Sequence, residues 1–200
     1  MKNPTTDADC GGFNLSALVL KHGKHGTTYH GECCVIEASN RVAACIPEFR
    51  DRFRAAPFSD DHPSISRVIR SFLSSWNDGL PTDADRTRLL LPYATRVLGT
   101  ATTAADEETR VWLATDWLVR VQAPAWLDLA KLTDRAVQLR ALPPLTSSEI
   151  ARGVQSVLEG ARRDAGAAWA AARAAFAPVV ATLQTSALEL LDRMIAVGAP

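Results

Sequence analysis

The sequence predicts an all-α protein, a compact helical bundle with a C-terminal helical hairpin or long bent helix. Apolar residues recur at helical spacing along almost the whole chain, and no run of β-branched and aromatic residues alternates long enough to indicate a strand. The 200 residues are 47% hydrophobic, which is sufficient for a buried core. We expect a helical body over residues 13–142 and a helical extension over 146–197, joined at Pro143-Pro144.

Glycine and proline divide the first part of the chain into short helices. Residues 14–22 are expected to form a helix that a glycine ends. Helical spacing returns at Glu32 and places Cys34 and Cys45 on one apolar face. Pro47 interrupts this face and predicts a break or a new helix start there, because proline cannot donate the helical hydrogen bond.

The middle of the chain carries two more helical segments. An apolar stripe over residues 65–76 ends at Asn77-Asp78-Gly79, a good helix C-terminus. Thr82 with Asp85 resembles a capping box and predicts the start of the next helix, which Pro92 should kink.

The clearest helix begins at Thr103, and its first turn is acidic, as the helix dipole favours. It is apolar on two sides, which predicts a central position, and Ala123-Pro124 is expected to stop it. Asp116 lies between the two apolar faces, where a buried carboxylate needs a partner. Arg120, one turn later, is the expected partner.

The tail, residues 146–197, has apolar residues at threes and fours from Ile150 to Met194, here called the tail seam. Thr146 and Glu149 predict a capping box at its start, and Pro178 predicts a turn or kink. Small residues in the seam permit close approach to another helix. The seam therefore predicts packing against the body, a second copy or a protein partner, of which self-association is favoured.

Three segments carry a resemblance to a known family. They are Gly31 to Ala38, with a Cys-x-x-Glu-Ala pattern, the Ser-Asp-Asp-His-Pro turn at 59–63, and Ser-Trp-Asn-Asp at 75–78. In these the chain resembles an uncharacterised family found in actinobacteria and their phages, from about residue 18 to 129. Relatives often carry cysteine at the position of Ser64. The resemblance implies no activity and leaves the tail uncovered.

Charge and leader signals narrow the class of protein. The chain has 22 basic and 22 acidic residues. It therefore lacks the net positive charge that gives most nucleic-acid-binding proteins their long-range electrostatic attraction. Arg152, Arg162, Arg163 and Arg173 form a weak basic strip, which keeps a nucleic-acid accessory role as one alternative. We expect neither a secretory signal nor a membrane span, and hence a cytoplasmic location.

The residues best suited to metal binding or catalysis are the histidines and cysteines of segment 22–34, together with His62. Imidazole and thiolate are the ligands that zinc prefers, and His25, Cys34 and His62 are the candidate ligands. A metal- or thiol-dependent activity is therefore an alternative. The competing interpretation is that Cys34 and Cys45 simply fill the core, as free cysteines commonly do.

Two further residues of this region are candidates for a reactive or polar site. Neighbouring side chains on a helix point about 100° apart, so Cys33 is expected to face away from the core if Cys34 joins it. Cys33 is thus the better candidate for a reactive thiol. Glu37 is expected to form an exposed ion pair with Arg41, with general acid or base work as the alternative.

A ligand pocket is the alternative for the tryptophans, with Asn77 and Asp78 at its rim, although tryptophans at helical spacing more often belong to the core. Its walls would be Trp76, Trp112, Trp117 and Trp126. Taken together, these patterns favour a non-enzymatic binding or interaction protein that acts through helical surfaces and needs no cofactor.

Overall fold

The computed structural model describes residues 14–23, 32–49, 62–172 and 177–199, with side chains described outside 165–179 and 181. It is 72% helical with almost no strand, which confirms the predicted all-α class. The chain divides into two compact units, residues 1–107 with 198–200 and residues 108–197. The predicted boundary near Pro143-Pro144 stays a prediction.

The first unit begins with a short 3-10 turn, η1 (Leu15–Ala17), and a strand, where the sequence predicted a helix over 14–22. Strand β1 (Val19–Leu20) pairs in parallel with β2 (Glu32–Cys33). Leu18 and Leu20 are buried and Val19 between them is exposed. This alternation has the period of a strand, so the helix prediction was wrong beyond its first turn.

Helix α1 (Val35–Cys45) starts three residues later than predicted, because Glu32 and Cys33 belong to β2. It ends at Cys45, directly before Ile46-Pro47, as expected. The helix is buried around most of its circumference, including three polar residues. Its polar buried residues are Glu37, Ser39 and Asn40.

In its described residues the first unit continues with α3 (Arg67–Gly79), α4 (Asp83–Leu90) and α5 (Tyr93–Arg96). The predicted end at Gly79 and the predicted Thr82 cap are confirmed, since the Asp85 amide donates to Thr82 Oγ1 at 3.0 Å. The interruption at Pro92 is confirmed as well.

A buried arginine closes the end of α3. Arg86 lies almost fully buried and donates from Nε to the Asn77 carbonyl at 2.6 Å and from Nη2 to the Leu80 carbonyl, while Nη1 pairs with Asp83. The last carbonyls of a helix have no partner within the helix, so a cation there satisfies them and complements the dipole.

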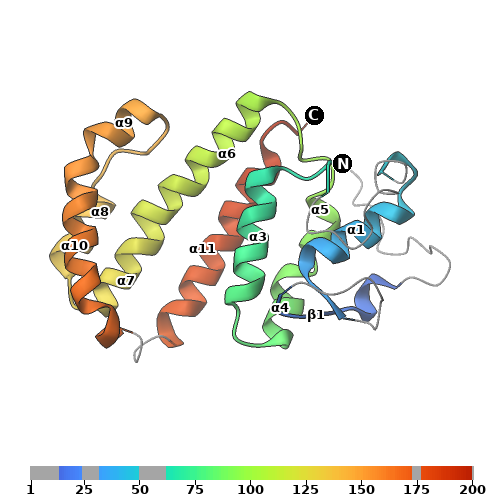
Figure 1. Ribbon diagram of the computed structural model, residues 1–200, viewed down its shortest axis with the longest axis horizontal. Coiled ribbons are helices and arrows are strands. Elements are labelled where there is room, and N and C mark those ends of the chain that lie inside the picture. The colour runs from blue at the N-terminus through green and yellow to red at the C-terminus, as the bar shows by residue number, and fades with distance from the viewer. Residues whose placement is uncertain (1–13, 24–31, 50–61, 173–176, 200) are drawn as a thin grey trace. The chain divides into compact units, whose positions relative to one another are not determined.

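The helices of the second unit run from α6, which spans the boundary between the units, to the end of the tail. They are α6 (Ala104–Trp117), the π-helical turn η2 (Leu118–Gln122), α7 (Ala123–Leu129), α8 (Thr133–Arg140), α9 (Ser148–Gly153), α10 (Gln155–Ala172) and α11 (Ala177–Ala196). Helices α7, α8 and α10 pack against one another (Figure 1). Their shared core contains four buried residues, Leu127, Ala136, Leu139 and Ala161.

Ala123-Pro124 does not stop the central helix, contrary to the prediction. The chain passes from α6 through η2 into α7, and the Ala123 amide donates to the carbonyl of Leu118, five residues back. Within an α-helix the proline ring would clash with the carbonyl four residues earlier, that of Arg120. A π turn is wider, so it takes up the proline without ending the helix.

The tail contains two long helices, α10 and α11, preceded by the short α9. The cap of α9 is Ser147, one residue after the predicted Thr146. Five side chains of the tail seam are buried against other parts of the chain. They are Val154, Ala161, Ala187, Leu190 and Met194. Packing within the chain therefore uses much of this seam.

Two buried side chains of α6 hold α11 in the second unit, and both helices run side by side in Figure 1. Arg110, fully buried, donates from Nε to the Met194 carbonyl at 3.0 Å and from Nη2 to the Val197 carbonyl at 2.6 Å. Trp117 donates from Nε1 to Ser186 Oγ at 3.1 Å. Among the described residues, none of the helices has the length and apolar character needed to cross a membrane.

Candidate functional site

The second unit contains an apolar pocket of about 510 Å³ between η2, α7, α8 and α10. Volumes of this size are typical of small-molecule sites. Most of its described lining is aliphatic or aromatic. The lining residues are Leu118, Val119, Gln122, Ala123, Trp126, Leu127, Ala130, Leu139, Leu158, Ala161 and Arg162.

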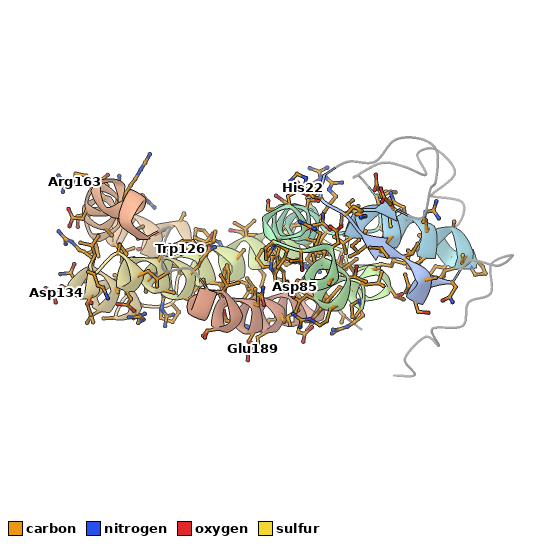
Figure 2. The ribbon with its side chains drawn as sticks, turned by 90° about the horizontal axis from the view of Figure 1, so that it is seen from below. His22, Asp85, Trp126, Asp134, Arg163 and Glu189 are labelled. Carbon is orange, nitrogen blue, oxygen red and sulfur yellow. The ribbon has the colours of Figure 1, made fainter. Side chains whose placement is uncertain are left out.

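The π turn forms one wall of this pocket, through Leu118, Val119 and Gln122. π turns are rare within helices and are frequent at functional sites. Figure 2 labels Trp126, which follows on α7 and lines the same pocket. The unusual backbone and the pocket thus coincide in one stretch of chain.

One buried side chain from each of α7, α8 and α10 closes the pocket on the side that faces the core. Leu127, Leu139 and Ala161 are buried members of the core cluster and also face the pocket. Ala161 permits α10 to approach closely, as the sequence suggested for the small residues of the tail seam. The pocket floor is therefore continuous with a packed core, which holds its shape.

Arg162 is the charged residue among the described lining of the pocket, and it is exposed. The nearest acidic residues of α10 are engaged elsewhere. Asp164 accepts from Arg135 Nε at 2.7 Å, and Glu159 accepts from Gln155 at 2.8 Å. Within the described part of the chain, the Arg162 guanidinium makes no ion pair, so a positive charge stands beside an apolar hollow.

Asp116 has the partner that the sequence predicted. Arg120 Nη1 lies 3.2 Å from its Oδ1, and the Leu145 amide donates to the same oxygen at 2.8 Å. The carboxylate is half-buried and joins α6 to the segment before α9. Its contacts favour a structural role over a chemical one.

Cys34 and Glu37 form a capping box at the start of α1. The Cys34 amide donates to Glu37 Oε2 at 2.7 Å, and the Glu37 amide donates to Cys34 Sγ at 3.5 Å. Both side chains are buried, so the prediction of an exposed Glu37 was wrong. Because α1 starts at Val35, Cys33 and Cys34 both precede the helix. The angle of about 100° between neighbouring helical side chains therefore does not apply to this pair.

Cys33 is 2% exposed, where the sequence predicted a side chain turned away from the core. Burial raises the pKa of its thiol from 9.0 to about 11. The thiolate is the nucleophile, so this environment disfavours a reactive cysteine at neutral pH. Leu20 and Cys33 face each other in the register of the β1–β2 pair, which explains the burial.

The candidate zinc ligands are described only in part, because His25 lies outside the described residues. His62 is buried, with its Nδ1 2.7 Å from Ser64 Oγ, and Cys34 caps α1. No group of three or more metal-ligating side chains occurs in the described ranges. The zinc site stays a prediction.

The six residues of the predicted aromatic pocket have different environments. Trp126 lines the pocket described above, and Trp117 bonds to Ser186 on α11. Asn77 is fully buried and donates from Nδ2 to the Lys21 carbonyl at 2.8 Å, while Asp78 is exposed and accepts from the Gly23 amide at 2.9 Å. Partial desolvation raises the pKa of Asp78, but the hydrogen bonds from the Gly23 amide and the Asn77 side chain lower it, and the pKa lies below its ordinary value. Trp76 packs edge-on against Phe72, and Trp112 belongs to the second unit.

No protein-family model, curated protein or solved structure matches this chain.

Proposed function

We propose that the protein acts by binding, and that its second unit takes up a small, largely apolar molecule in the pocket beside the π turn. The observation that carries this proposal is the coincidence of a 510 Å³ apolar hollow with the π turn Leu118–Gln122. An open apolar hollow in water costs free energy that an apolar ligand recovers on entry, at roughly 25 cal/mol per Å² buried.

The chemistry of the lining supports binding over catalysis. Its described residues include neither carboxylate, imidazole, thiol nor hydroxyl groups, the usual acids, bases and nucleophiles of enzymes. The polar groups there are the Gln122 amide and the Arg162 guanidinium, which suit recognition of a ligand.

Calorimetric titration with decanol, a neutral and flexible apolar probe, tests this proposal. Leu118 lines the pocket and is 48% exposed, so Leu118→Gln should leave the fold intact and weaken decanol binding by roughly threefold through lost apolar contact. Val111→Gln is the matched control, because Val111 is 44% exposed on α6 and does not line the pocket.

Unchanged affinity in the control and reduced affinity in Leu118→Gln is the expected result. Saturable binding that neither variant alters would place decanol elsewhere on the protein and refute the proposal. Absence of decanol binding by the wild-type protein would refute the proposal as well. The pocket would then suit a helix of a protein partner.

The self-association expected from the tail seam stays a separate prediction. Much of that seam is buried within the chain, at Ala161, Leu190 and Met194 for example. Sedimentation equilibrium of the full chain at several concentrations measures it directly, and a monomer throughout would contradict it.

A further inference from the structure

We propose that the ligand of the pocket is a medium-length monocarboxylic acid whose alkyl chain fills the hollow and whose carboxylate pairs with Arg162. This inference rests on the proposed function and adds the chemical class of the ligand. It follows from the sign of the charge at the rim, the apolar character of the interior and the volume.

The sign of the charge comes from Arg162. Among the described lining residues Arg162 is the charged one, and none of these residues is acidic. The two acidic residues nearest to it on α10 already bond to Gln155 and Arg135. A ligand with one negative charge would therefore meet a cation that the described protein groups leave without an ion pair.

The position of that charge follows from solvation. A carboxylate within the apolar interior would lose its hydration without compensation, which is strongly unfavourable. Arg162 is exposed, so a carboxylate beside it stays hydrated and gains a charge-assisted hydrogen bond. The Gln122 side chain, also in the lining, offers a second polar contact. The apolar end of the ligand then points toward Leu127 and Leu139 of the core.

The volume and the single cation set the class of molecule. At about 30 Å³ for each water-sized group, the hollow of 510 Å³ has room for about 17 such groups. A medium-length alkyl chain fits within this volume and leaves its carboxylate at the rim beside Arg162. A phosphate monoester carries up to two negative charges and would call for more than one cation. The described lining residues supply one guanidinium, that of Arg162, which favours a carboxylate.

The test compares decanoate with decanol in the same calorimetric titration at pH 7 and low salt. Decanoate should bind the wild-type protein about two- to fivefold more tightly than decanol, as expected of an exposed ion pair. Arg162→Gln should remove this preference, so that the two probes bind this variant with the same affinity. Arg163→Gln is the matched control, because Arg163 is the adjacent exposed arginine of α10 and does not line the pocket.

The outcomes separate the two proposals. If decanol binds at the Leu118 site and decanoate shows no preference that depends on Arg162, the ligand class is wrong and the binding function stands. If neither probe binds there, both fail. A salt titration of the wild-type protein gives a second measurement that needs no variant. The decanoate preference should shrink as salt rises, and a preference that salt does not change would overturn the ion pair.

Discussion

Replacement of Arg110 by methionine should destabilise the second unit strongly. The guanidinium is fully buried and donates to the carbonyls of Met194 and Val197, at the end of α11. Methionine keeps much of the apolar stem and removes the charge and the donors. The terminal carbonyls of α11 would then lose the partners that satisfy them.

The size of the loss follows from these two hydrogen bonds. A hydrogen bond that involves a charged group contributes about 1.5–3 kcal/mol, and the favourable position of a cation at a helix C-terminus is part of that value. Since methionine recovers some packing, we expect a loss of about 3–5 kcal/mol. This is a large share of the 5–15 kcal/mol that typically stabilises a folded domain.

Urea unfolding followed by tryptophan fluorescence measures this loss in the appropriate unit, because every tryptophan except Trp76 lies within residues 108–197. Arg193→Met is the matched control. Arg193 is an exposed arginine in the last turn of α11, so its replacement should change the free energy of unfolding by less than about 0.5 kcal/mol. A loss below about 1 kcal/mol in Arg110→Met would refute the capping role.

Two further predictions concern the first unit. The thiol of Cys33 has its pKa raised from 9.0 to about 11, so its burial stabilises the fold below pH 9 and this contribution is lost as the pH rises from 9 to 11. The free energy of unfolding of the wild type should therefore fall relative to Cys33→Ala across that range, and parallel pH profiles would contradict the burial of the thiol. Asn77→Ala should cost about 1–3 kcal/mol by leaving the Lys21 carbonyl and the Val35 amide without their side-chain partner, measured by thermal unfolding followed by circular dichroism. The exposed Ser75→Ala on the same helix should change little, and equal effects of the two would sink this interpretation.

The sequence predicted the helices well where local signals determine them. The Thr82 cap, the end of α3 at Gly79 and the pairing of Asp116 with Arg120 depend on residues within one or two turns of each other. Such contacts form as soon as the helix does. Periodicity and capping residues are therefore sufficient to predict them.

The prediction failed where distant segments decide the local structure. Residues 19–20 form a strand because 32–33 pair with them, and nothing within residues 14–22 signals that partner. The same pairing delays α1 and buries Cys33. Glu37 was predicted at the surface from its spacing to Arg41. It is buried and accepts from the Cys34 amide, a contact that depends on where the helix begins.

The pocket could not be predicted from the sequence for a related reason. Its walls come from residues 118–162, and their convergence depends on how α7, α8 and α10 pack. One signal was present, since Pro124 within a strongly helical pattern indicates either an end or a distortion. The sequence alone favoured the end, and the structure has the distortion, a π turn that lines the pocket.

The position of bound decanoate is the most direct test of the binding proposal. Nuclear Overhauser contacts between the alkyl protons of decanoate and the indole of Trp126 are expected, with none to Trp76 of the first unit. Contacts to Trp76 in place of Trp126, or a bound decanoate that contacts no residue of the π turn, would contradict the account.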